Sequence, residues 1–103
     1  MKIDVIIPTY KPGIEFEKLI GRLQNQEYPI HKIIIINTRT DIFPKELDRS
    51  NYEIEITHIE PDQFDHGGTR NMGAGMSDAD IVVYMTQDAI PVDEKLIGTF
   101  AKI

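Results

Sequence analysis

Four short apolar runs are spaced along the chain, and each has the length of a β-strand. The runs at 3–8 and 32–36 are almost continuously aliphatic, which is typical of strands buried on both faces. The run at 53–59 alternates apolar and polar residues, which indicates one solvent-facing side near the edge of a sheet. A fourth run, 81–85, is again mostly apolar, so the pattern predicts four strands in all.

Apolar residues recur at helical spacing between these strands. The clearest stripe runs from Ile14 to about Gln26 and predicts an amphipathic helix. Weaker patterns predict a helical turn at 43–47, a short helix at 69–77 and a helix that begins at Leu96. Strands that alternate with helices imply right-handed crossovers. The chain therefore predicts an α/β fold: a Rossmann-like, three-layer, doubly wound and mostly parallel sheet of about four strands.

Polar residues gather where the predicted strands end. Parallel sheets of this kind bind ligands outside the carboxyl ends of their strands, close to the point where the strand order reverses. The segments expected there are 9–10, 37–41, 61–65 and 86–88. Topology alone therefore predicts a ligand site at this edge of the sheet.

Composition narrows the possible ligands and the class of protein. The chain has 103 residues, the size of one domain, and its net charge of −6 argues against a nucleic-acid partner. It has no cysteine, which excludes disulfides, thiolate zinc sites and thiol nucleophiles. No signal peptide and no apolar stretch of membrane-spanning length is visible, so we expect a cytoplasmic protein, with peripheral attachment to the membrane left open.

Three residues at the predicted edge can each be interpreted in two ways. Asp88 follows the fourth strand, where a carboxylate either holds a divalent cation or closes a turn. Asn37 and Asp41 follow the second strand, where they either contact a nucleotide base or ribose, or form an Asx turn. The residues alone leave both interpretations of each position open.

The segment FDHGGTRNMGAG, residues 64–75, matches neither the dinucleotide-binding glycine pattern nor the Walker loop. A glycine pair before a helix still allows backbone N–H groups to approach an anion, and Arg70 adds a charged donor. The alternative is a helix entry in which the two glycines only relieve strain. His66 has no metal-ligand partners nearby in the sequence and is typical of a hydrogen-bonding loop residue.

Four motifs occur in an order that resembles the family-2 inverting glycosyltransferases of the GT-A fold, in particular their rhamnosyltransferase-like branch. They are VIIPTYKP, IIIINTRTD, FDHGGTRNMGAG and IVVYMTQDAIP, and together they extend over essentially the whole chain. The resemblance implies that the 103 residues are the N-terminal, nucleotide-sugar-binding part of such an enzyme, without its acceptor-binding half or general base.

The resemblance also implies roles for individual residues. Asn37 stands where the family usually has an aspartate, and Asp88 matches the retained acid of an Asp-x-Asp motif that would hold Mg²⁺ or Mn²⁺. Eight residues are expected to bind or border the donor, although no particular role follows for His66 or Gln87: Thr9, Tyr10, Asn37, Asp41, His66, Arg70, Asn71 and Gln87.

The implied activity is transfer of a sugar, with rhamnose suggested, from a nucleoside-diphosphate sugar to a sugar or lipid-linked acceptor in cell-surface polysaccharide synthesis. The 103 residues by themselves are expected to be weakly active or inactive. The alternative is a non-catalytic module that binds nucleotides or associates with itself as a homo-oligomer. A phospho-acceptor receiver domain is disfavoured, because no acidic pair follows the first strand.

Overall fold

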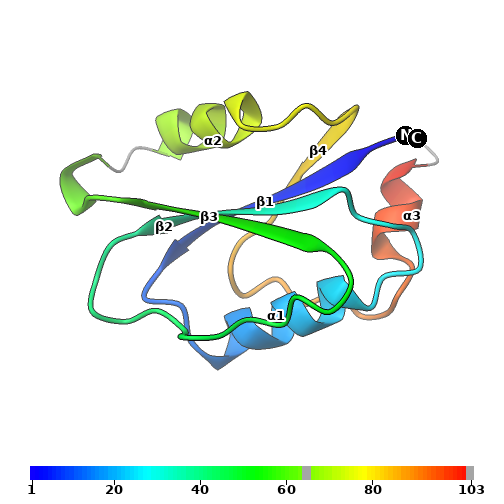
Figure 1. Ribbon diagram of the computed structural model, residues 1–103, viewed down its shortest axis with the longest axis horizontal. Coiled ribbons are helices and arrows are strands. Elements are labelled where there is room, and N and C mark those ends of the chain that lie inside the picture. The colour runs from blue at the N-terminus through cyan, green and yellow to red at the C-terminus, as the bar shows by residue number, and fades with distance from the viewer. Residues whose placement is uncertain (64–65, 102–103) are drawn as a thin grey trace.

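The computed structural model describes residues 1–63 and 66–101, with only the backbone of residues 66 and 67. Four strands, three α-helices and one short 3-10 helix alternate along the described chain (Figure 1). Their bounds are β1 (Ile3–Tyr10), α1 (Ile14–Gln24), β2 (Lys32–Thr38), β3 (Glu53–Ile59), η1 (Pro61–Gln63), α2 (His66–Gly75), β4 (Ile81–Tyr84) and α3 (Leu96–Ala101).

The four strands form one parallel sheet in the order β3-β2-β1-β4. The chain builds outward from β1 to β3 and then crosses back to place β4 on the other side of β1. The strand order therefore reverses between β1 and β4. The strands run from right to left in Figure 1, so their carboxyl ends lie at the left, together with the beginnings of α1 and α2.

Each face of the sheet is covered by helices, as side-chain alternation along the strands requires. On one face, α1 and α3 pack over alternate strand residues, with Val5, Ile7, Ile33 and Ile35 fully buried among them. The opposite face carries the intervening residues and is covered by α2 (Figure 1); its buried members are Ile6, Ile34, Ile36 and Ile59. These are the three layers that the sequence predicts.

Helix α2 lies unusually close to the sheet because a glycine faces the strands. A Cβ atom at Gly73 would stand 2.6 Å from Cγ2 of Ile6 and 3.2 Å from Cδ1 of Ile36. Real Cβ atoms do not approach carbon so closely, so any side chain at this position would push the helix away from β1 and β2.

A buried glutamine fixes the long connection between β2 and β3. The side chain of Gln24 is fully buried, and its Nε2 donates to the carbonyl oxygens of Asp48 and Tyr52 at 2.8 and 3.0 Å. Its Oε1 accepts from the backbone N–H groups of Asn51 and Tyr52 at 2.9 and 2.6 Å. One amide thus replaces the regular backbone pairing that this loop lacks.

The predicted fold class is confirmed, with three local differences. β1 and β2 each continue two residues beyond the predicted ends, because Thr9 and Tyr10 pair with Asn37 and Thr38. The helical turn predicted at 43–47 is wrong. Phe43 and Leu47 instead pack singly against the core on the α1 side, and the loop is held by Gln24 rather than by a helical hydrogen-bond ladder.

The third difference concerns the glycine-rich segment. Helix α2 begins at His66 and not at Thr69, so Gly67 and Gly68 belong to its first turn and do not precede it. The 3-10 helix η1 was not predicted either.

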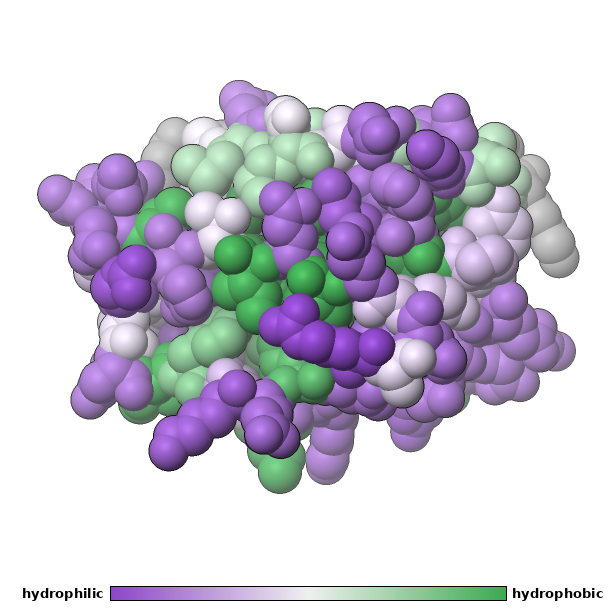
Figure 2. Space-filling view, viewed as in Figure 1, coloured by the Kyte–Doolittle hydropathy of each residue, from purple (hydrophilic) through white to green (hydrophobic). Residues whose placement is uncertain are grey.

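The surface over the edge strand β3 carries both apolar and polar side chains. Figure 2 shows apolar side chains over the middle of the face that β3 turns to the viewer, surrounded by polar ones. Within the described ranges, no helix has both the length and the apolar character needed to cross a membrane.

Candidate functional site

A pocket of about 320 Å³ opens where the strand order reverses, at the carboxyl ends of β1 and β4. The end of β1, the first turns of α2 and the segment that follows β4 enclose it. Its lining residues are Pro8, Thr9, Tyr10, Thr69, Arg70, Tyr84, Met85, Thr86 and Gln87. Reversal points of open α/β sheets are where such folds bind ligands, so this pocket is the candidate functional site.

Gln87 ties the two strands together at the mouth of the pocket. Its Oε1 accepts from the backbone N–H of Tyr10 at 2.7 Å, and its Nε2 donates to the carbonyl oxygen of the same residue at 3.1 Å. Both ends of the carboxamide are therefore engaged with β1. Gln87 shapes the site by continuing the β1–β4 pairing past the last strand residue.

Aromatic rings and cations face each other around the pocket. The guanidinium of Arg70 lies 5.7 Å from the ring centre of Tyr84, and the Tyr84 hydroxyl donates to the Arg70 carbonyl oxygen at 3.1 Å. The ammonium of Lys11 lies 5.5 Å from the ring centre of Tyr10. Both tyrosines are exposed, so these rings offer flat apolar surfaces to a ligand.

Backbone strain accompanies this arrangement. Lys11 has φ = 46°, in the left-handed region that a residue with a Cβ adopts at a cost of roughly 1 kcal/mol. It is the one non-glycine residue with positive φ in the described part of the chain. The strained residue directly follows Tyr10, the last residue of β1, and so sets how the chain leaves the pocket.

One buried polar atom in the pocket wall lacks a partner. The Thr69 side chain is 3% exposed, and its Oγ1 has no hydrogen-bond partner among the described residues. Most buried hydroxyls in folded proteins are paired, so an exception in a pocket wall is informative.

Asn37 is the register partner of Thr9 on the neighbouring strand β2, and its side chain is buried. Thr9, Asn37 and His58 are aligned across three strands, and Thr9 Oγ1 donates to Asn37 Oδ1 at 2.7 Å. Asn37 Nδ2 lies 3.1 Å from His58 Nδ1. Asn37 is 1% exposed, and it does not line the pocket.

The predicted site residues thus fall into two groups. Thr9, Tyr10, Arg70 and Gln87 are brought together around the pocket. The others are not among its lining residues: Asn37 is buried, Asp41, Asn71 and Asp88 are exposed, and the side chain of His66 lies outside the described residues. Asp88 nevertheless follows Gln87 directly, at the same edge of the sheet.

A separate group of possible metal ligands lies at the opposite edge. Atoms of Asp4, His31 and Asp78 lie within 4.8 Å of one another, the one such group of three in the described ranges. Asp4 is fully buried; it lies 2.8 Å from His31 Nδ1 and accepts from Ser77 Oγ at 2.5 Å. Since these residues precede β2 and β4 or begin β1, the group cannot act together with the pocket.

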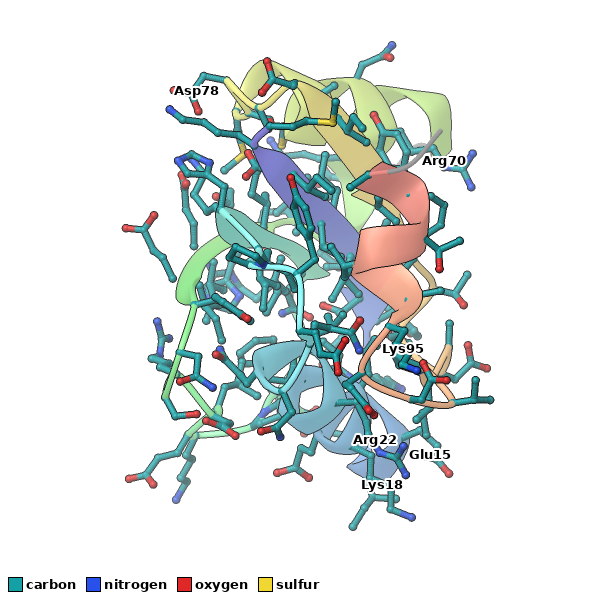
Figure 3. The ribbon with its side chains drawn as sticks, turned by 90° about the vertical axis from the view of Figure 1, so that its right-hand side faces the viewer. Glu15, Lys18, Arg22, Arg70, Asp78 and Lys95 are labelled. Atoms are coloured by element: carbon teal, nitrogen blue, oxygen red, sulfur yellow. The ribbon has the colours of Figure 1, made fainter. Side chains whose placement is uncertain are left out.

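Asp78 and Arg70 are also apart across the width of the sheet, as the view from the amino edge shows (Figure 3). In Figure 3, Asp78 and Arg70 point to opposite sides of the molecule. At the amino edge, Lys32 also pairs with Glu55 at 3.0 Å, and this hydrogen bond raises the pKa of Lys32 above its usual 10.5.

Five wall residues were not among the predicted donor-binding residues: Pro8, Thr69, Tyr84, Met85 and Thr86. Tyr84 is the one aromatic residue in its strand and stands at the ligand end, a signal that was available. Thr69 precedes Gly73 by one helical turn, so the spacing of a polar residue and a sheet-facing glycine could have indicated it.

The arrangement can hold a flat ring and an adjacent anion. Two tyrosine rings and Met85 supply apolar surface, while Arg70 is the one charged residue in the lining. Small-molecule sites commonly combine such walls with a few well-placed polar groups.

Comparison with known proteins agrees with this description. Residues 4–103 match the model of Glycosyl transferase family 2. The chain is 36% identical over 100 residues to the O-antigen chain rhamnosyltransferase RfbN of Salmonella typhimurium, covering 94% of this chain and 31% of that protein. It is 35% identical over 88 residues to the O-antigen chain rhamnosyltransferase WbaN of Salmonella anatum, covering 84% of this chain and 28% of that protein.

Solved structures share the fold. The crystal structure of S. aureus TarS residues 1–349 superimposes with a TM-score of 0.77 at 17% identity, over 99% of this chain and 32% of that one. A second crystal structure of TarS gives 0.73 at 19% identity, over 98% of this chain and 19% of that one.

The fold is thus an α/β arrangement that matches GT-A glycosyltransferase structures. The chain belongs to glycosyl transferase family 2. It spans about a third of the length of the curated relatives that it matches.

Proposed function

We propose that this chain is the donor-binding part of a glycosyltransferase that moves a sugar from a nucleoside-diphosphate sugar to a sugar or lipid-linked acceptor in cell-surface polysaccharide synthesis. The observation that carries the proposal is the pocket at the reversal point of the sheet, in a chain of this family. The relatives named as O-antigen chain rhamnosyltransferases support rhamnose as the sugar and the cytoplasm, or the inner face of the membrane, as the location.

The residues at the pocket suit the donor half of this reaction. The nucleoside would lie against Tyr10 and Tyr84, and Arg70 would donate charge-assisted hydrogen bonds to the diphosphate. The acceptor hydroxyl attacks the anomeric carbon while the bond to the diphosphate oxygen breaks, and a general base takes the hydroxyl proton. We assign no residue of this chain to that base.

A divalent cation fits the same edge. Asp88 offers an exposed carboxylate immediately after Gln87, and Mg²⁺ is commonly held by one or two carboxylates together with substrate phosphates. Such an ion neutralises the charge that develops on a departing diphosphate. Thr86, two residues earlier, supplies no second carboxylate, so Asp88 would be the single protein acid of the site.

Calorimetric titration with uridine and thymidine diphosphate, with and without Mn²⁺, tests the proposal. We expect binding that Mn²⁺ strengthens. Arg70→Met should weaken binding by roughly 10- to 100-fold, the range expected for loss of a charge-assisted hydrogen bond. Arg49→Met is the matched control, because Arg49 lies outside the pocket and donates to the Ile54 carbonyl oxygen.

The cation is tested separately. Asp88→Asn should abolish the strengthening by Mn²⁺, whereas Asp62→Asn should not, because Asp62 is an exposed acid of η1, which follows β3, two strands away from β1. If the folded protein binds no nucleoside diphosphate even with Mn²⁺, the proposed function is wrong.

A non-catalytic module that associates with itself is the second candidate. Apolar side chains beyond the edge strand β4 favour it, since Val92 is 91% exposed and Ile90 is 37% exposed. Light scattering after size exclusion would decide: a dimer that loses its partner on Val92→Glu supports self-association, and a monomer at all concentrations excludes it.

A further inference from the structure

The hydroxyl group of Thr69 is built into the structure in a way that the fold does not explain. Its oxygen is buried and lacks a hydrogen-bond partner among the described residues, yet the residue lines the pocket. Burying a hydroxyl without a partner is unfavourable, and a methyl group in its place would be neutral or stabilising. A threonine here therefore costs stability in the unliganded protein.

The packing of α2 brings this hydroxyl to the pocket wall. Thr69 and Gly73 are four residues apart and lie on the same side of the helix, which faces β1 and β2. Gly73 lets the helix approach Ile6 closely, and Thr69, one turn earlier, is buried where it lines the pocket with Pro8, Thr9 and Tyr10. Threonine in helices occupies two χ1 rotamers, and we take a rotation about the Cα–Cβ bond to bring the hydroxyl to a bound ligand.

The surrounding residues indicate what would meet it there. Tyr10 and Tyr84 line the same pocket, and their rings suit a flat and largely apolar group. Gln87 has both ends of its carboxamide engaged with Tyr10, and Arg70 lies over the Tyr84 ring. Thr69 is therefore a neutral group that can both donate and accept a hydrogen bond at the edge of a planar ring.

We propose that the Thr69 hydroxyl is a specificity-determining group that hydrogen-bonds the edge of the donor nucleobase. This inference rests on the proposed function, because it assumes that the pocket receives a nucleotide. It assigns the diphosphate to Arg70 and the base to Thr69.

The test compares Thr69→Val, which replaces the hydroxyl with a methyl group of nearly the same shape, with Thr69→Ser, which keeps the hydroxyl. Thr57→Val is the matched control, since Thr57 lies on β3, outside the pocket, with its Oγ1 4.0 Å from Met76 Sδ. Binding of uridine, thymidine and guanosine diphosphates and of inorganic pyrophosphate is measured by calorimetry, and the unfolding midpoint is measured for each variant.

We expect Thr69→Val to weaken the best-bound nucleoside diphosphate about tenfold, as loss of one hydrogen bond would. Its affinity for pyrophosphate should be unchanged, and its unfolding midpoint should be equal to or above that of the wild type. Thr69→Ser and Thr57→Val should bind as the wild type does.

Three results would overturn the inference while leaving the proposed function intact: equal nucleotide binding by Thr69→Val, an equal loss for pyrophosphate, or a lowered unfolding midpoint that Thr69→Ser restores. The last result would mean that the hydroxyl serves the fold. If the wild type binds pyrophosphate but no nucleoside diphosphate, or binds neither, the proposed function and this inference both fail.

Discussion

Gln24 near the amino edge of the sheet and Thr69 near its carboxyl edge are both buried polar residues, but only the first has hydrogen-bond partners among the described residues. At the amino edge, Asp4 and Gln24 are fully buried and their polar atoms are paired within the protein. At the carboxyl edge, Thr69 has a buried hydroxyl with no partner among the described residues, and Lys11 adopts a strained backbone conformation. The carboxyl edge also has paired buried groups, Thr9 and Asn37, so the contrast is between individual residues.

The difference separates residues that hold the fold from residues that we propose contact a ligand. Buried polar groups that are paired fix loops and strand ends, as Gln24 does for 48–52. Unpaired groups and backbone strain persist where another molecule provides the compensation. Four substitutions test this contrast.

The largest effect is expected at the amino edge. Gln24→Leu leaves four backbone groups of the 48–52 loop without partners, so the free energy of unfolding should fall by about 3–4 kcal/mol. Urea denaturation measures the loss. Asn25→Ala is the control, because exposed Asn25 makes one side-chain bond, to the Gly21 carbonyl oxygen, and its loss should change stability by roughly 0.5 kcal/mol. A Gln24→Leu protein as stable as the wild type would contradict the contrast.

The second effect lies in the helix that joins the two edges. Gly73→Ala introduces a Cβ that would stand 2.6 Å from Ile6, so we expect a loss of about 2 kcal/mol and weaker nucleotide binding as α2 moves outward. Gly75→Ala in the same helix meets nothing within 4 Å and should raise stability by about 0.5 kcal/mol. Thermal unfolding of both variants measures the difference. Equal effects of the two substitutions would show that the close approach of α2 does not contribute to stability.

The third effect is a dependence on pH at the amino edge. The hydrogen bond to Glu55 raises the pKa of Lys32 above 10.5, so charged Lys32 stabilises the fold fully below that value. The stabilisation is lost as the pH rises through the raised pKa, and it should amount to less than about 1 kcal/mol because Glu55 is partly exposed. Lys32→Met should lack this alkaline loss in denaturation curves from pH 9 to about 11.5. Parallel curves for both proteins would contradict the assignment.

The smallest effect is expected at the carboxyl edge and has the opposite sign. Lys11→Gly relieves the positive φ and should raise the free energy of unfolding by about 0.5 kcal/mol, after the added freedom of the unfolded chain is counted. Lys11→Ala keeps the strain and removes the ammonium, so it should bring no gain. Denaturant midpoints compare the two, and a gain in the alanine variant would place the cost in the side chain and not in the backbone.

The layers of the fold followed from the pattern of apolar residues because that pattern repeats over many positions. Ile33 to Ile36 in β2 and the alternation of β3 each gave their strand with nearly correct bounds. The turn at 43–47 was wrong because Phe43 and Leu47 have helical spacing yet are held by contacts with distant residues, which no local pattern records. The start of α2 was misplaced for a related reason, since glycine has low helix propensity and only packing keeps Gly67 and Gly68 helical.

The candidate site, too, was predicted only in part. Motif order placed Thr9, Tyr10, Arg70 and Gln87 at one edge, and these four do line one pocket. Asn37 was grouped with them because it stands at the end of β2, but its side chain is buried in contacts with Thr9 and His58 and does not line the pocket. These contacts join three strands, so no local pattern records them. The role of Gln87 in bridging to the Tyr10 backbone was equally invisible, because it depends on two strands 77 positions apart.

The α/β class, the family motifs and the edge of the sheet at which polar residues converge could be predicted from the sequence, because periodicity and spacing are local properties of the chain. Which of those residues share a pocket depends on long-range packing. Strand order put β4 beside β1, and the missing side chain at Gly73 let α2 settle against Ile6. Those two long-range facts left the Thr69 hydroxyl buried in the pocket wall.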